Sequence, residues 1–143
     1  MLDLSHEIDY INWIFGKIKK IKYSNSGKIS NLQINSDDHL LLNGIAGKID
    51  FVLNLNYYSR LNERLIYIYG NSFSLKADLI KNKIEIFVKN KKIIKYKLIK
   101  EFTYIQQHKA ILNNKFTNCC SFNEGKIVLN VIDKIKESNN KKL

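Results

Sequence analysis

The sequence is poor in several residue types and patterns that mark particular classes of protein. Its 143 residues include no proline, one tryptophan and one methionine. No apolar run approaches the roughly 20 residues that a membrane-spanning helix needs. No basic segment followed by an apolar stretch and a small-residue cleavage site opens the chain. We therefore expect a cytoplasmic protein with no membrane partner.

Cysteine is also scarce. The two cysteines, Cys119 and Cys120, are neighbours in the sequence. A disulfide between adjacent residues is strained, because the bond needs a specific separation and torsion. The expected state is therefore two free thiols in a reducing compartment.

Arginine is nearly absent although the chain is strongly basic. The formal net charge is +11, and Arg60 and Arg64 are the only arginines among 24 basic residues. Proteins that bind nucleic acids generally use guanidinium groups for bidentate contacts with phosphate and guanine. Lysine, isoleucine and asparagine are over-used together, a bias that an AT-rich genome produces without any polyanionic partner. We therefore expect no nucleic-acid partner. Binding to any nucleic-acid duplex, weakening steeply with salt, is kept only as the weakest functional hypothesis.

Apolar residues, in contrast, are abundant. Hydrophobic residues make up 45% of the chain and aromatic residues 11%, which is enough for a folded core. The sequence has no internal repeat, linker or change of composition. The prediction is therefore one domain over residues 1–143.

Three segments carry helical periodicity. The apolar positions of the first are Leu4, Ile8, Ile11 and Phe15, and Gly16 can end this helix in a left-handed conformation. The second helix is expected over residues 101–113. The third begins at a capping box, in which Ser121 and Glu124 satisfy each other's backbone amides. Its apolar stripe continues at Val128, Val131, Ile132 and Ile135.

Between the first two helices the apolar period changes towards two. Residues 49–57 alternate most clearly, and they follow residues 40–43 through a glycine-containing hairpin loop at 43–47. Ser24-Asn25-Ser26-Gly27 is expected to form a turn. Further strands are predicted at 65–69, 73–77, 84–89 and 93–98, with connections so short that neighbours should be antiparallel. The predicted fold class is α+β, an open, mostly antiparallel sheet of about six strands with helices packed on one face. Its other face stays bare, which suits packing against another subunit.

Several motifs share their order and spacing with a known family. The first is Asp3-Leu4-Ser5-His6-Glu7-Ile8-Asp9-Tyr10, running into Trp13-Ile14-Phe15-Gly16. It is followed by Ser30-x-Leu32-x-Ile34-x-x-Asp37-Asp38, by a corner from Arg64 to Gly70, by Ser74 to Asp78, and by the closing helix that begins Ser121-x-x-Glu124-Gly125. In these motifs the sequence resembles the C-terminal domain of the glucose-fructose oxidoreductase / inositol dehydrogenase (Gfo/Idh/MocA) family. The resemblance implies a dihydrodipicolinate-reductase-like C-terminal domain, here without the family's preceding Rossmann domain.

The resemblance also implies a function and two site residues. The chain would be the substrate-binding domain of an NAD(P)-dependent sugar or cyclitol oxidoreductase, truncated or acting with a separate nucleotide-binding chain. Alcohol oxidation needs a group that accepts a proton near neutral pH, which suits histidine. The family's catalytic His and Asp of the opening helix match His6 and Asp3, while its catalytic Lys belongs to the missing domain. Asp3 precedes His6 by three positions where many members have four, and Asp9 could also orient the imidazole.

Cofactors and partners follow from the same resemblance. No strand, glycine loop and helix of the G-x-G-x-x-G type occurs, so we expect no cofactor to bind this chain alone; NAD or NADP is implied for the complete enzyme. No metal-ligand spacing occurs either. The implied partners are a sugar or cyclitol, a separate Rossmann-domain chain, and further copies of this chain packed through the open sheet face. Alone, the chain is expected to be inactive.

Two alternatives stay open beside this interpretation. Asp3 or Ser5 can simply cap the first helix, with His6 an ordinary first-turn residue. The chain would then be a non-catalytic oligomerisation or sugar-binding module. Among the other histidines, His39 is expected at a strand start and His108 on a solvated helix face.

Overall fold

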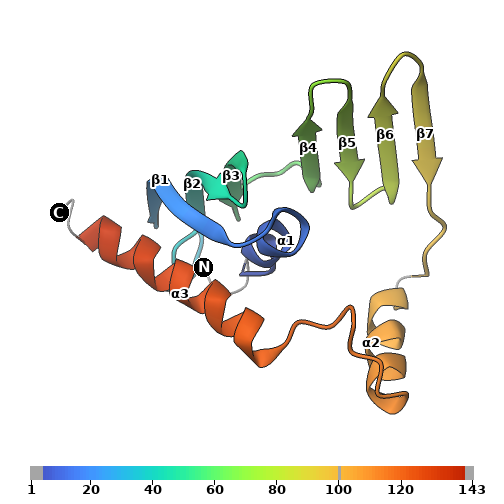
Figure 1. The fold of residues 1–143 in the computed structure, drawn as a ribbon. Coiled ribbons are helices and arrows are strands. Elements are labelled where there is room, and N and C mark those ends of the chain that lie inside the picture. The colour runs from blue at the N-terminus through green and yellow to red at the C-terminus, as the bar shows by residue number, and fades with distance from the viewer. Residues whose placement is uncertain (1–4, 100, 141–143) are drawn as a thin grey trace. The chain divides into compact units, whose positions relative to one another are not determined.

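The structure is a computed structural model that describes residues 5–99 and 101–140, with side chains described as far as residue 138. This part of the chain contains three helices and seven strands, which are labelled in Figure 1. Their bounds are α1 (Ser5–Phe15), β1 (Ile18–Gly27), β2 (His39–Ala46), β3 (Ile49–Asn56), β4 (Leu65–Tyr69), β5 (Ser74–Asp78), β6 (Lys83–Phe87), β7 (Lys91–Lys95), α2 (Phe102–Leu112) and α3 (Phe122–Asn140). Over these described residues no helix is both long and apolar enough to cross a membrane.

The chain forms two compact units. The first unit joins residues 1–59 to residues 120–143, and the second comprises residues 60–119. Each unit contains its own antiparallel sheet. The first unit therefore brings together two segments that are far apart in the sequence.

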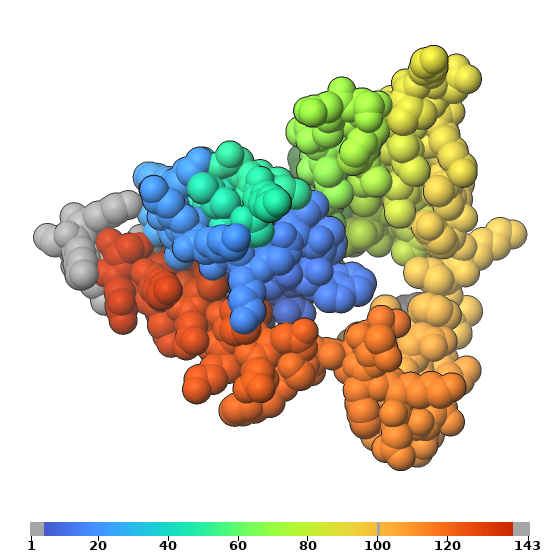
Figure 2. Space-filling model, in the orientation of Figure 1, coloured from blue at the N-terminus to red at the C-terminus, as the bar shows by residue number. Residues whose placement is uncertain are grey.

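The sheet of the first unit has the strand order β1-β2-β3. Burial alternates along the central strand β2, because successive side chains of a strand point to opposite faces of the sheet. Leu40, Leu42, Gly44 and Ala46 are buried, whereas the residues between them are half-buried. The register places Leu55 opposite Leu40 and Leu53 opposite Leu42, on the same face. Figure 2 shows α3, in orange and red, lying directly against α1 and β1, in blue.

Helix α3 supplies the other half of this core. Four of its residues pack with Ile8 of α1 and with Leu40 and Leu42 of β2; they are Val128, Val131, Ile132 and Ile135. All four are at most 6% exposed. The apolar stripe predicted for this helix is therefore confirmed.

Both predicted helix ends are also confirmed. Gly16 has a φ of +90°, and its amide donates to the carbonyl oxygen of Asn12 at 3.0 Å, which closes α1. At the start of α3, the Ser121 amide donates to Glu124 Oε2 at 2.7 Å, and the Glu124 amide donates to Ser121 Oγ at 3.3 Å. These reciprocal bonds are the capping box that the sequence predicts.

A glycine turn joins β2 to β3 beside the end of α1. Ala46 pairs with Ile49, so the connection consists of Gly47 and Lys48. Gly47 has a φ of +57°, and its amide donates to the carbonyl oxygen of Lys17 at 3.1 Å. A β-carbon on Gly47 would lie 2.1 Å from the carbonyl oxygen of Phe15. The turn therefore packs against the helix end at backbone distance.

The second unit contains a sheet in the order β4-β5-β6-β7, together with α2. Its register separates side chains by face, with Ile66, Ala77, Ile84 and Ile94 in one row and Tyr67, Lys76, Glu85 and Ile93 in the next. Successive rows point to opposite faces of a sheet. Helix α2, described along its whole length, has no buried residue.

The predicted fold class is confirmed as α+β with antiparallel strands, and the structure differs from the prediction in detail. Within residues 5–99 and 101–140, seven strands form one sheet of four strands and one of three, whereas about six strands in a single sheet were expected. The turn expected at residues 24–27 is wrong, because β1 continues through Gly27 and pairs there with His39. The hairpin loop expected at 43–47 is shorter, since β2 extends to Ala46. The single domain over residues 1–143 stays a prediction.

Candidate functional site

His6, the predicted catalytic residue, lies in the first turn of α1 with its side chain 47% exposed. Its Nε2 lies 3.3 Å from a Glu7 carboxylate oxygen. The imidazole also meets the Tyr10 ring edge to face, with centroids 6.0 Å apart. The side chain is therefore reachable from solvent. Asp3, the second predicted catalytic residue, lies outside the described residues.

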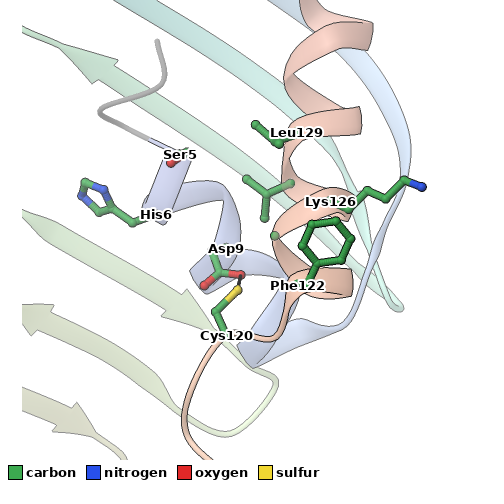
Figure 3. Close-up of a pocket in the computed structure, with 9 residues that line it drawn as sticks. Ser5, His6, Asp9, Cys120, Phe122, Lys126 and Leu129 are labelled. Carbon is green, nitrogen blue, oxygen red and sulfur yellow. Dashed lines mark hydrogen bonds between the residues drawn. The ribbon is translucent and has the colours of Figure 1, made fainter. Parts of the chain in front are cut away.

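Asp9 contacts a cysteine, although the sequence suggested that it could orient His6. Its Oδ1 lies 3.9 Å from the thiol Sγ of Cys120, which precedes α3. Figure 3 shows His6 and Asp9 pointing to different sides of α1, with Asp9 directed at Cys120. The structure thus brings Asp9 and Cys120 together across 111 positions of sequence.

Cys119 and Cys120 both carry free thiols. Burial raises the pKa of the Cys120 thiol, and the negative charges of Asp9 and Glu124 raise it further. The reactive form of cysteine is the thiolate. Cys120 is therefore suited to donate a weak hydrogen bond to Asp9 and poorly suited to act as a nucleophile.

An open groove of about 620 Å³ lies in the first unit, where α1 faces the start of α3. Its polar lining comes from Ser5, His6 and Asp9 on α1, Cys120, and Lys126 on α3. The rest is the apolar part of α3, formed by Phe122, Gly125, Val128 and Leu129. The volume falls within the range of roughly 300–1,000 Å³ that is usual for small-molecule sites.

This groove was not predicted from the sequence, although the sequence places two apolar residues, Phe122 and Leu129, seven positions apart in α3. Phe122 is 86% exposed and Leu129 is 49% exposed. Residues seven positions apart share one side of a helix. This pair lies off the stripe formed by Val128, Val131, Ile132 and Ile135, on a side where a helix of this kind usually carries polar residues. A second apolar side on α3 indicates a surface other than the core.

A buried carboxylate, Asp38, organises the loop between β1 and β2. Its two oxygens accept hydrogen bonds from the backbone amides of Ile29 and Ser30, each at 2.9 Å, and from the Ser30 hydroxyl. Burial alone raises the pKa of Asp38, but these bonds and the nearby charge of Lys28 outweigh it and lower the pKa to about 2. The side chain is wholly buried. Asp38 is therefore an ionised clamp for the loop, a role that was not predicted from the sequence.

The other histidines have local surroundings. His39 Nδ1 lies 3.0 Å from the carbonyl oxygen of Gly27 and 4.0 Å from Asp38. His108 is exposed on α2. Within residues 5–99 and 101–140 no three side chains of His, Cys, Asp or Glu are grouped closely enough to hold a metal ion.

The described residues lack the strand, glycine-rich loop and helix that usually bind a nicotinamide dinucleotide. Such cofactors bind where a parallel strand runs through a glycine-rich loop into a helix, whose first amides hold the pyrophosphate. In the described part of the chain every strand pair is antiparallel. Helix α2, which follows β7, is preceded by no glycine-rich sequence.

Comparison with known proteins identifies the fold. No protein-family model matches the sequence, and no curated protein does. Solved structures do match, and among them are UDP-N-acetylglucosamine 3-dehydrogenase GnnA of Acidithiobacillus ferrooxidans, with a TM-score of 0.71 and 12% identity, and the proposed oxidoreductase yvaA of Bacillus subtilis, with a TM-score of 0.69 and 18% identity. The matches cover 92% and 96% of this chain, but 44% and 49% of those chains. This chain therefore has the fold of nearly half of each of two proteins named as oxidoreductases.

Proposed function

We propose that this chain is the substrate-binding part of an NAD(P)-dependent oxidoreductase that acts on a sugar or a cyclitol. The observation that carries the proposal is the fold, which matches nearly half of two oxidoreductase chains over more than nine-tenths of this one. The nucleotide-binding part would be a separate chain or domain. Members of the Gfo/Idh/MocA family, which the opening motif resembles, divide their work in this way.

The antiparallel sheets support this division of labour. A dinucleotide needs a parallel strand, loop and helix, and both sheets described here are built from antiparallel pairs. The chain would therefore contribute the walls of the substrate site and leave the cofactor to its partner. Self-association through a sheet face belongs to the same proposal.

His6 is the residue proposed to handle the substrate proton. Oxidation of a secondary alcohol requires a base within hydrogen-bond reach of the hydroxyl. The His6 imidazole is nearly half exposed and lies at the start of α1, so a bound alcohol can approach it. Glu7 and Tyr10 restrict how the ring turns. Asp3 is proposed to assist His6, by analogy with the family.

The first experiment tests binding by the chain alone. The ¹⁵N-labelled protein is titrated with UDP-N-acetylglucosamine, glucose and myo-inositol, and separately with NADH and NADPH. The expected result is that at least one sugar or cyclitol shifts amide signals in α1, while neither dinucleotide shifts any. Saturable binding of either dinucleotide would refute the proposed division of labour.

The second experiment tests His6 in the assembled enzyme, in which this chain is combined with a partner that carries a G-x-G-x-x-G sequence. His6→Ala should lower the rate of NAD(P) reduction by about 100-fold or more, the usual contribution of a positioned base. His108→Ala is the matched control, because His108 is also an exposed helical histidine. Equal rates for the two variants would favour the alternative of a non-catalytic sugar-binding or oligomerisation module.

A further inference from the structure

The groove beside α3 contains an aromatic ring that the fold holds out into solvent. Phe122 is the first residue of α3 and is 86% exposed, although phenylalanine is among the residues most often buried. The preceding Ser121 is fixed by its reciprocal bonds with Glu124. The backbone beneath the ring is therefore rigid, so the ring can present its face without being packed.

From this arrangement we propose that the groove is a subsite for a hexose that carries a phosphate group. The hexose would stack on Phe122, its hydroxyl groups would donate to Asp9, and its phosphate would pair with Lys126. The choice of a sugar rests on the proposed function. The three roles rest on the geometry of the groove.

The apolar side of the groove fits the carbon face of a sugar ring. Leu129 continues the exposed apolar surface of Phe122, and Val128 beneath them is only 5% exposed. Gly125 lies between Phe122 and Leu129 in the helix, and a β-carbon built on it meets no atom within 4 Å. Glycine therefore leaves this stretch of the groove open. Apolar and aromatic walls with a few polar groups are typical of small-molecule sites.

Asp9 can accept hydrogen bonds from sugar hydroxyls. A carboxylate offers about four lone-pair sites, and the contact with the Cys120 thiol, at 3.9 Å, is a weak and long one. Burial and the nearby carboxylates raise the pKa of this thiol, which favours its protonated form. Asp9 therefore keeps acceptor capacity toward the groove that it lines.

Lys126 can pair with an anionic group at the other end. It is exposed and lies one helical turn after Phe122. In the view of Figure 3 the Asp9 carboxylate and the Lys126 ammonium group lie on opposite sides of the Phe122 ring, and all three residues line the groove. A ligand stacked on the ring would thus have hydroxyl groups toward Asp9 and a phosphate toward Lys126. The net charge of +11 also favours the approach of an anion.

Cys120 provides a readout that does not depend on enzyme activity. The chain has two cysteines, so Cys119→Ser leaves Cys120 as its one thiol, and this thiol lines the groove. The rate of Cys120 alkylation is measured at mildly alkaline pH with glucose, glucose 6-phosphate, UDP-N-acetylglucosamine and inorganic phosphate. At least one of the two phosphorylated sugars should slow alkylation saturably, by about tenfold more than glucose or phosphate at equal concentration. The two sugar arms separate a simple sugar phosphate from a sugar nucleotide.

Variants in the Cys119→Ser background test each role. Phe122→Ala should weaken protection by about tenfold, whereas Phe116→Ala, which removes another exposed ring outside the groove, should leave it unchanged. Lys126→Gln should remove the preference for the phosphorylated sugar over glucose. Gly125→Leu favours the helix and fills the groove, so it should abolish protection in a folded protein. Circular dichroism confirms folding of each variant.

Three results would overturn the inference. They are an alkylation rate that no sugar changes, protection by inorganic phosphate equal to that by the phosphorylated sugars, and full protection in Phe122→Ala. If the sugar still shifts signals of α1 while Cys120 is unprotected, the subsite fails and the proposed function stands. If Cys120 is protected but the chain alone binds a dinucleotide, the subsite stands and the proposed division of labour fails.

Discussion

Four glycines allow two sources of backbone constraint to be separated by one type of substitution, glycine to alanine. Gly16 and Gly47 have positive φ values of +90° and +57°. Gly44 and Gly47 lie so close to backbone that a β-carbon would be 2.4 Å from Lys20 O or 2.1 Å from Phe15 O. Gly125 has neither constraint. The four positions therefore form a complete comparison of backbone conformation against steric overlap.

The expected free-energy changes follow from these distances and angles. Gly16→Ala should destabilise by about 1–2 kcal/mol, the cost of a left-handed conformation with a β-carbon. Gly44→Ala should destabilise by about 1–3 kcal/mol, because the strands must move apart to admit the methyl group. Gly47→Ala combines both costs and should lose about 2–5 kcal/mol. Gly125→Ala should gain about 0.5–1 kcal/mol through helix propensity.

Urea unfolding followed by tryptophan fluorescence measures these changes. Trp13 is the one tryptophan of the chain and lies in α1, so its signal reports on the first unit. Equal slopes of free energy against urea across the variants would show that midpoints can be compared directly. The reasoning would be refuted if Gly47→Ala were as stable as either Gly16→Ala or Gly44→Ala.

Two further predictions concern the core and the loop clamp. Ile132→Ala should destabilise the first unit by about 2–5 kcal/mol, because Ile132 is 1% exposed in the core. Leu112→Ala, at an 81% exposed position, should change stability by less than about 0.5 kcal/mol. Similar urea midpoints for the two variants would contradict the described packing. Asp38→Asn should remove a part of the stability that is sensitive to acid. The pKa of Asp38 in the folded protein, about 2, lies below the ordinary 3.8, so ionised Asp38 stabilises the fold above pH 3.8. This contribution is lost as the pH falls from about 3.8 to 2. Over that window the urea midpoint of the wild type should fall more steeply than that of the variant, and parallel curves would exclude the clamp.

Features set by neighbouring residues were predictable from the sequence. The end of α1 at Gly16 and the capping box at Ser121 and Glu124 both occur as expected. Strand β4 has the predicted bounds, residues 65–69. These features depend on backbone conformation and on hydrogen bonds within one or two helical turns. Local chemistry decides them.

Features set by distant residues were not predictable in the same way. Residues 24–27 have the composition of a turn, but Ser24 is buried and its hydroxyl lies 2.6 Å from that of Ser138 in α3. The partner is 114 positions away. Pairing with β2 then keeps the segment extended. Tertiary contacts override turn propensity here.

The features of the candidate site also differ in whether they depend on neighbouring or on distant residues. The exposed position of His6 at the start of α1 agrees with its predicted role, which stays a prediction. The contact between Asp9 and Cys120 could not be inferred from the sequence. Helical periodicity shows which residues share a helix face, but it does not identify the segment that packs against that face. The sequence places Phe122 directly after Ser121 in the capping box, but the exposure of its side chain could not be predicted from the sequence.

The division of the first unit between the two ends of the chain has a consequence for its synthesis. On the ribosome, Leu40 and Leu42 emerge long before Ile132 and Ile135, which cover them in the finished protein. The nascent β1, β2 and β3 would carry an uncovered apolar face during the translation of some sixty intervening residues of the second unit. Such a face is a target for chaperones and for aggregation. Release of α3 from the exit tunnel should therefore be the event that allows this apolar face to be covered.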